Sequence, residues 1–191
     1  MSAEAMKRVY LAGPEVFLPN ALEVGRSKVE MARAAGFEGL FPLDQQLGLE
    51  GMPKLEQARR ISLANEALMR SADFLIANLT PFRGVSMDSG TAFEVGFMRA
   101  LGRPVLGYTN VPGDYRQRAE AFRRRGIPAG DSDAAGLEIE DFGMAENLMI
   151  AVAILESGGC VVEGQAAEGR EMADLAAFER CLEQARRLLL D

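Results

Sequence analysis

Short apolar runs alternate with longer amphipathic stretches along the chain. Apolar runs of four to seven residues predict buried strands, and apolar positions repeated at helical spacing predict helices. The strands are expected at residues 8–13, 37–43, 73–79, 104–108 and 160–163, the second being either a strand or an extended segment. The helices are expected at residues 21–36, 54–72, 90–102, 145–159 and 171–190. This alternation favours a mostly parallel sheet with helices on both faces.

We therefore expect residues 1–191 to form a single open α/β domain, with five mostly parallel strands between two layers of helices. A chain of 191 residues with 48% hydrophobic content can bury a full core without disulfides or metals. In sheets of this kind, ligands bind beyond the carboxyl ends of the strands, near the point where the strand order reverses. The segments expected to share this rim are residues 10–14, 43–46, 78–84 and 108–110.

The composition narrows the possible partners. The formal net charge of -7 repels polyanions, so we expect no binding to nucleic acid. No apolar run reaches the roughly 18 residues of a membrane span, and the first residues lack a secretory signal, so we expect a cytoplasmic protein that does not bind membranes. The one basic cluster, residues 116–126, is interpreted as a solvated helix face. It falls within residues 111–136, which are expected to form a loop with one helix near the pocket.

Histidine is absent, so acid–base and nucleophilic chemistry near neutral pH falls to carboxylates, cysteines, tyrosines or a metal. Cys160 and Cys181 do not have the spacing of metal ligands, and we expect neither a metal nor a cofactor. Asp88 and Glu94 lie near the expected start of a helix, where backbone N–H groups and the helix dipole favour ionised carboxylates. Capping and periodicity alone favour a structural interpretation, in which Asp88 caps the helix and Glu94 is an ordinary first-turn acid.

Five sequence blocks change this interpretation. In chain order they are VYLAGPEVF, FPLD, SADFLIANLTPFRG, DSGTAFEVGFMRALGRPV and EDFGMAENLMI. Together they resemble the motifs of the nucleoside 2-deoxyribosyltransferase family, from Val9 to Ile150 and most densely between Asp73 and Val105. The block that begins at Asp88 is specific where it follows a strand and opens a helix, and the order of all five blocks is the strongest signal.

The resemblance implies a flavodoxin-like parallel sheet. It also implies that the enzyme exchanges the base of a 2'-deoxynucleoside for a free nucleobase, through a covalent deoxyribosyl-enzyme. Glu94 matches the nucleophilic glutamate of the family, and Asp88 matches the acid that contacts the base and helps to protonate it as it leaves. Tyr10 matches the tyrosine that hydrogen-bonds the nucleophile and the sugar region. Without the resemblance, Tyr10 is equally well explained as a core residue.

Other positions are expected to bind the substrate. Asn147 resembles the asparagine that a neighbouring subunit lends to the sugar hydroxyls, with Met149 close beside it, so the resemblance implies a homo-oligomer that is at least a dimer. The further substrate-binding positions are Gly13, Asp44, Arg83 and Gly84. From the residues alone, Asn147 is an exposed polar residue, Arg83 a loop cation and Asp44 the start of a turn.

The chemistry agrees with this assignment. Breaking an N-glycosidic bond passes through a state that resembles an oxocarbenium ion, so an anionic carboxylate beneath the anomeric carbon stabilises the developing charge and can then capture it. A second carboxyl must protonate the departing base. The neighbouring acid favours proton donation by Asp88, whereas the helix terminus opposes it.

Two other functions remain open at this point. The first is hydrolysis of a 2'-deoxynucleoside 5'-monophosphate, for which Ser86, Ser89 and Arg83 are available as phosphate ligands. The overall acidity and the absence of a Gly/Ser-rich first loop weigh against it. The second is a non-catalytic nucleotide-binding domain, because a fold does not dictate an activity. The presence of Tyr10, Asp88 and Glu94 speaks against this second alternative.

Overall fold

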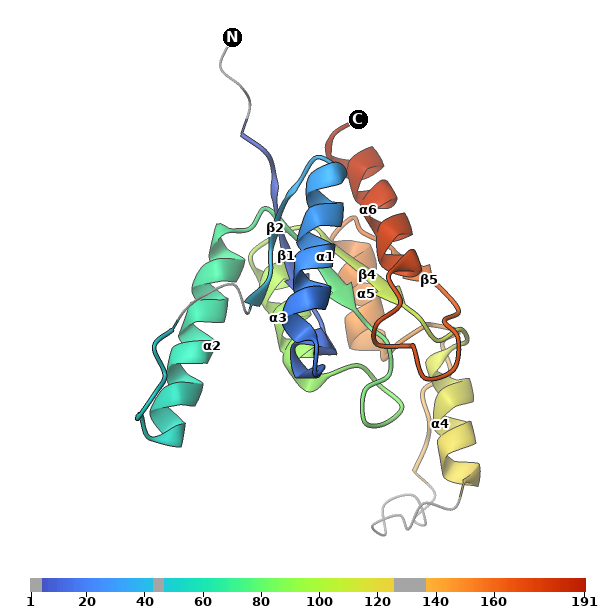
Figure 1. Cartoon of the computed structure of the whole chain (residues 1–191). Coiled ribbons are helices and arrows are strands. Elements are labelled where there is room, and N and C mark those ends of the chain that lie inside the picture. Colours follow the sequence, from blue (N-terminus) through green and yellow to red (C-terminus); the bar gives the residue numbers. More distant parts are fainter. Residues whose placement is uncertain (1–4, 43–46, 126–136) are drawn as a thin grey trace.

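A computed structural model describes residues 5–42, 47–125 and 137–191. Five strands form its centre (Figure 1): β1 (Arg8–Ala12), β2 (Glu38–Leu40), β3 (Phe74–Asn78), β4 (Val105–Thr109) and β5 (Val161–Glu163). The helices are η1 (Pro14–Phe17), α1 (Ala21–Ala34), α2 (Lys54–Ser71), α3 (Ser89–Ala100), α4 (Tyr115–Arg124), α5 (Leu148–Glu156) and α6 (Ala176–Leu189).

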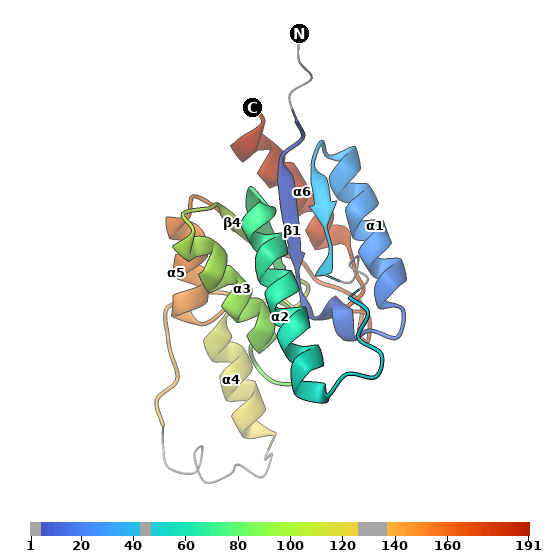
Figure 2. The same ribbon diagram turned by 90° about the vertical axis from the view of Figure 1, so that its left-hand side faces the viewer.

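All five strands are parallel, in the order β2-β1-β3-β4-β5. This is the order of flavodoxin-like sheets, so the expected fold class is confirmed. The order reverses between β1 and β3, whose register pairs Tyr10 with Leu75. The segments after β1, β3 and β4 all emerge at the carboxyl end of the sheet, where α4 also lies (Figure 2). Ligands are therefore expected at this end of the sheet.

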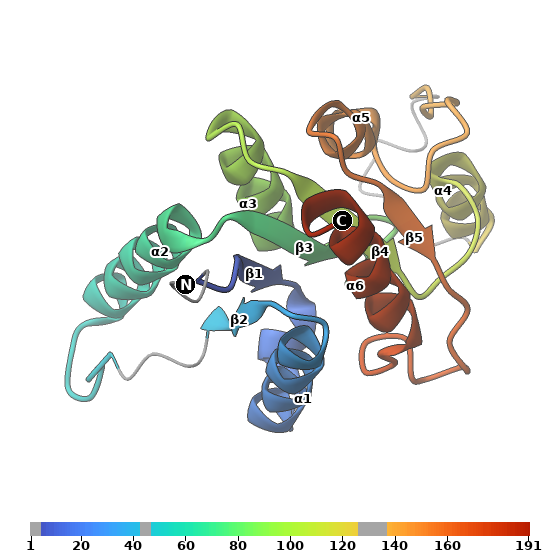
Figure 3. The same ribbon diagram turned by 90° about the horizontal axis from the view of Figure 1, so that it is seen from above.

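The helices cover the two faces of the sheet unequally. Figure 3 shows α1 and α6 on one face and α2, α3 and α5 on the other. Alternate strand residues point to opposite faces, and so each face has its own core. Leu11, Ile76 and Tyr108 pack toward α1 and α6, whereas Tyr10 and Leu75 pack toward α3 and α5. The face to which Tyr10 points is thus the face that carries α3.

The structure shortens three of the expected elements by more than two residues. The second strand covers only Glu38–Leu40 of the expected 37–43. Helix α5 begins at Leu148 instead of residue 145, because the side chain of Asn147 caps it. Helix α6 begins at Ala176 instead of residue 171. The expected helix within residues 111–136 is α4, and η1 was not predicted. Of the helices described, none is long and apolar enough to cross a membrane.

Candidate active site

Tyr10 and Glu94 meet at the centre of the site. Tyr10 lies within β1 and is fully buried, and Glu94 lies in α3, which packs on the same face of the sheet. The Tyr10 hydroxyl donates a hydrogen bond to Oε1 of Glu94, with 2.6 Å between the two oxygens. A strand and a crossover helix thus bring together two side chains that are far apart in the sequence.

Glu94 is held in a state close to half-ionised at neutral pH. Its pKa rises from 4.5 to about 7, chiefly because burial disfavours the charged form. The hydrogen bond from Tyr10 opposes this rise, whereas the negative charge of Asp88 adds to it. Sequence reasoning expected the helix dipole to keep Glu94 ionised. Glu94, however, lies beyond the first turn of α3, where the dipole effect has largely faded.

Asp88 is the N-cap of α3. Its Oδ2 accepts hydrogen bonds from the backbone N–H of Thr91 at 3.0 Å and from the Thr91 hydroxyl at 3.3 Å. The expected capping role is therefore present. Within the described residues, Oδ1 of Asp88 accepts no hydrogen bond.

Asn147 caps α5 at the same end of the sheet. Its Oδ1 accepts a hydrogen bond from the N–H of Met149 at 3.0 Å, and its Nδ2 donates to Glu140 at 2.6 Å. Met149 itself is 71% exposed and points away from the core of its own chain. Both polar groups of Asn147 thus have partners within this chain.

Arg83 lies in the loop after β3, in the left-handed region with φ of 55°. Its guanidinium lies 4.5 Å from the ring centroid of Phe82 and 5.3 Å from that of Phe17. The two rings are themselves stacked, with centroids 5.3 Å apart. Gly84 is exposed, with open space where a Cβ would be. Asp44 lies outside the described residues.

A side chain would not fit at Gly13, because a carboxylate occupies the space beside it. A Cβ at this position would lie 1.9 Å from Oε2 of Glu15. Glu15 is fully buried, and its Oε1 accepts hydrogen bonds from Lys28 at 2.7 Å, from Tyr108 at 2.8 Å and from Asn78 at 3.2 Å. This network therefore explains the glycine without a substrate.

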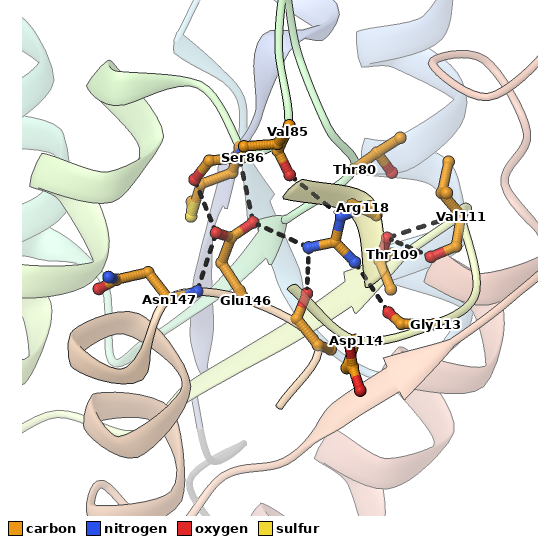
Figure 4. A network of polar contacts seen from close by, with 12 residues as sticks. Thr80, Val85, Ser86, Thr109, Val111, Gly113, Asp114, Arg118, Glu146 and Asn147 are labelled. Carbon is orange, nitrogen blue, oxygen red and sulfur yellow. Dashed lines mark hydrogen bonds and ion pairs between the residues drawn. The ribbon is translucent and has the colours of Figure 1, made fainter. Parts of the chain in front are cut away.

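A second buried ion pair joins the loops around the site (Figure 4). Arg118 of α4 contacts Glu146 at 3.6 Å, and their side chains are 11% and 0% exposed. The interpretation of residues 116–126 as a solvated helix face is wrong for Arg118, because its guanidinium binds carbonyl oxygens of the neighbouring loops. The other arginines described in α4 have exposed positions.

Comparison with known proteins identifies the family. Residues 9–149 match the family model described as nucleoside 2-deoxyribosyltransferase. The chain belongs to this family. An uncharacterised protein of Schizosaccharomyces pombe is 36% identical over an alignment of 167 residues, which covers 80% of this chain and 79% of that protein.

Solved structures agree with this assignment. A 2-deoxyribosyltransferase from Leishmania mexicana is 30% identical, with a TM-score of 0.57 over 75% of this chain and 85% of that one. A 2-deoxyribosyltransferase from Bacillus psychrosaccharolyticus shares the fold, with 21% identity and a TM-score of 0.50 over 88% of this chain and 93% of that one. Family and structural likeness indicate an enzyme of the deoxyribosyltransferase type.

Sequence reasoning did not find three parts of this nucleoside 2-deoxyribosyltransferase family site. They are the Phe17–Phe82 stack, the Glu15–Lys28 pair and the Arg118–Glu146 pair. Only Glu15, Phe17, Phe82 and Glu146 belong to blocks that resemble the family. Lys28 and Arg118 lie in stretches that have the pattern of ordinary solvated helices, and so nothing in the sequence indicates that they are buried.

Proposed function

We propose that this protein transfers the 2'-deoxyribosyl group of a 2'-deoxynucleoside to a free nucleobase through a covalent bond to Glu94. The hydrogen-bonded pair of Tyr10 and Glu94 carries the proposal, because it places a carboxyl that is half-ionised near pH 7 at the ligand-binding end of the sheet. Such an exchange would serve nucleoside salvage in the cytoplasm.

The proposed reaction has two steps, formation of the glycosyl-enzyme and its attack by the incoming base. In the first, Glu94 forms a bond to the anomeric carbon while the bond from that carbon to the base nitrogen breaks, and the electron pair leaves with the base. In the second, a nitrogen of the incoming base attacks the same carbon, and the Glu94 carboxylate departs. The Tyr10 hydroxyl donates to Glu94 and so favours the ionised form that attacks.

Asp88 is the group proposed to supply the proton. Its cap uses only Oδ2, so Oδ1 is the oxygen that would carry a proton into the reaction, pass it to the departing base and take it back from the incoming one. Asp88→Asn keeps a good N-cap and so tests the proton transfer without loss of the helix. Full turnover of purine nucleosides by this variant would show that the proton comes from elsewhere.

The aromatic stack beside the site suits a nucleobase. Phe17 is 56% exposed at the carboxyl end of β1, and Arg83 lies over its ring. The exposed part of such a stack would offer a flat base an aromatic surface, regardless of which base it is. Burial raises the pKa of the Cys181 thiol and, to a lesser degree, that of Cys160, so neither supplies a thiolate near neutral pH.

We further propose that the enzyme is a homo-oligomer, at least a dimer, in which Asn147 completes the site of a neighbouring subunit. The layer of α2, α3 and α5, which faces the viewer in Figure 2, exposes many large apolar side chains. They are Leu55, Ile61, Leu63, Phe93, Leu101, Met149, Val152 and Leu155. Exposed apolar side chains in such numbers support association of this layer with a second copy. In that arrangement, Nδ2 of Asn147 would exchange its bond to Glu140 for one to a sugar hydroxyl.

The activity is tested with a deoxynucleoside, with and without a second free base. Transfer predicts that a new deoxynucleoside forms when the second base is present. A slow substrate should trap the sugar on Glu94, which mass spectrometry of peptides would locate, and Glu94→Ala should be inactive. Sugar trapped on another residue, or an active Glu94→Ala protein, would refute the proposal. An active monomer at assay concentration would refute the shared site.

Hydrolysis of a 5'-monophosphate is the alternative, and the structure gives a reason to rank it second. Of its three expected phosphate ligands, Ser86 donates its hydroxyl to Glu146 at 2.6 Å, and Arg83 is stacked on aromatic rings. The same assay with a deoxynucleoside monophosphate separates the two reactions. Release of free base from the monophosphate, without any acceptor, would favour the hydrolase.

A further inference from the structure

We propose that Arg118 and Glu146 are positioning residues that hold the Asp88 end of α3 and the Asn147 end of α5 in one rigid unit (Figure 4). The inference rests on the proposed function, in which Asp88 serves its own site and Asn147 serves the site of a neighbouring subunit. Each such unit would then fix parts of two active sites. We call the two side chains and their bonds the Arg118–Glu146 clamp.

Glu146 connects the two ends directly. Its Oε1 accepts hydrogen bonds from the hydroxyl of Ser86 at 2.6 Å and from the N–H of Asn147 at 2.9 Å. Its Oε2 accepts the N–H of Met87 at 3.1 Å and lies 3.6 Å from Arg118. Ser86 and Met87 immediately precede Asp88 in the sequence. One fully buried carboxylate therefore binds the residues next to the proposed acid and the backbone of the proposed donated residue.

Arg118 ties the same carboxylate to three further loop positions. Its Nε donates to the carbonyl of Val85 at 3.0 Å, its Nη1 to the carbonyl of Gly113 at 2.8 Å, and its Nη2 to the carbonyl of Ala145. The guanidinium is planar and rigid, so these bonds fix the relative positions of the loops after β3 and β4 and of the segment before α5.

The Arg118–Glu146 clamp positions the loops around the site more than it stabilises the fold. A buried ion pair is weak evidence for stabilisation, because well-packed apolar residues often replace it without loss. Within the part of the chain that the structure describes, the hydrogen bonds of the two side chains all end on loops at the carboxyl end of the sheet. A misplacement of roughly 1 Å at a reacting group can cost about 100-fold in rate, so these loops require such anchoring.

Glu146→Gln is the most direct test. Each oxygen of Glu146 faces two hydrogen-bond donors. The side-chain NH2 group of glutamine is itself a donor, so in either orientation it faces two donors from which it cannot accept a hydrogen bond. We expect a folded dimer whose kcat/KM per site falls by at least about tenfold. Glu120→Gln is the matched control, since Glu120 forms exposed ion pairs on the same helix as Arg118. The control should retain wild-type activity.

Mixed dimers separate a positioning role from a merely structural one. A dimer of one Glu146→Gln subunit and one Glu94→Ala subunit, purified through two different tags, has a single Glu94. That site has an altered Asp88 end but receives Asn147 from a subunit with an intact clamp. Its reference is the dimer of wild type with Glu94→Ala. We expect activity per Glu94 at least about threefold above the Glu146→Gln homodimer and at least about threefold below the reference.

Each other outcome overturns the inference. Activity equal to the reference would mean that the clamp serves only Asn147, and activity equal to the homodimer would mean that it serves only its own site. Wild-type activity of the Glu146→Gln homodimer would refute it outright. If Glu94→Ala is inactive in that case, the proposed function stands and only the clamp fails, whereas an active Glu94→Ala homodimer would defeat the proposed function itself.

Ser86→Ala keeps the inference testable should Glu146→Gln fail to fold. This change removes one hydrogen bond on the Asp88 side and leaves the backbone bond of Asn147 in place. Activity per Glu94 should fall equally in the Ser86→Ala homodimer and in its mixed dimer with Glu94→Ala. Unchanged activity, or recovery in the mixed dimer, would overturn the inference.

Discussion

Removal of the Tyr10 hydroxyl should change how the activity depends on pH. Tyr10→Phe deletes the hydrogen bond of 2.6 Å to Oε1 of Glu94 and leaves the aromatic ring in the core. This bond favours the ionised carboxylate and is the largest influence that lowers the pKa of Glu94. Without it, burial and the charge of Asp88 act unopposed by the hydroxyl, and so the Glu94 pKa rises further above about 7.

The size of the effect follows from the strength of the bond. A hydrogen bond to a charged group contributes about 1.5–3 kcal/mol, and one pKa unit corresponds to about 1.4 kcal/mol. Because Glu94 keeps some contact with solvent, we use the lower end of this range and expect a shift of about one unit. With a pKa of about 7, about half of the Glu94 carboxyls are ionised at pH 7, and the shift leaves about a tenth.

The assay is kcat/KM for base exchange measured from pH 5 to pH 9. In the wild type, the ionised fraction of Glu94 should rise with pH through about 7. In Tyr10→Phe, this rise should move up by about one pH unit, so that activity relative to wild type at the same pH is about fivefold lower at pH 7 and nearly equal at pH 9, since loss of the Asp88 proton at high pH lowers both activities alike. Tyr115→Phe, which removes a hydroxyl elsewhere at the same end of the sheet, should keep the wild-type profile. A uniform loss at every pH would refute the reasoning, because it would show that Tyr10 does not act through the Glu94 charge.

Three further predictions concern stability and metals. Glu94→Gln should stabilise the protein by about 2 kcal/mol at pH 8 and clearly less at pH 5. The pKa of Glu94 is about 7 in the folded protein and 4.5 in the unfolded chain, so ionisation of Glu94 destabilises the fold as the pH rises from 4.5 to 7, and glutamine does not ionise. Thermal melts at both pH values check this, and equal shifts would contradict it. Lys28→Met leaves the buried Glu15 without its cation and should cost about 3–5 kcal/mol in urea unfolding, whereas Arg60→Gln, which breaks an exposed pair, should cost under about 1 kcal/mol. Similar losses in both variants would show that burial of the pair is unimportant. EDTA should leave base exchange unchanged, since the proposed steps use only carboxyl and hydroxyl groups, and a loss restored by a divalent ion would contradict this.

The sheet could be predicted from the sequence because its strands are buried on both faces. β3 and β4 are buried at every position, and such strands give continuous apolar runs. The ends of elements were less predictable. Residues 145–147 continue the helical pattern of α5, yet Asn147 ends it by capping, and this depends on where the chain enters the helix. The short η1 has no periodicity that would indicate it.

The candidate site also has a part that the sequence predicts and a part that it does not. The spacing of Asp88 and Glu94 and the cap of α3 are local, so the sequence contains them. The raised pKa of Glu94 cannot be predicted locally, because it arises from burial by elements that are distant in the sequence. Lys28 and Arg118 show the same limit. Each lies in a polar helical stretch that resembles a solvated face, and only tertiary packing places each beside a buried carboxylate.

The Glu15–Lys28 pair lies on the opposite face of the sheet from Tyr10, yet its charges reach Glu94. Glu15 raises the pKa of Glu94 and Lys28 lowers it, so the intact pair raises that pKa less than Glu15 would alone. Burial and the negative charge of Asp88 then remain as the influences that keep Glu94 protonated, and the Tyr10 hydroxyl remains as the principal one that ionises it. The pair can therefore be buried across the sheet from the proposed nucleophile with little effect on its charge, which burial and the Tyr10 hydrogen bond chiefly decide.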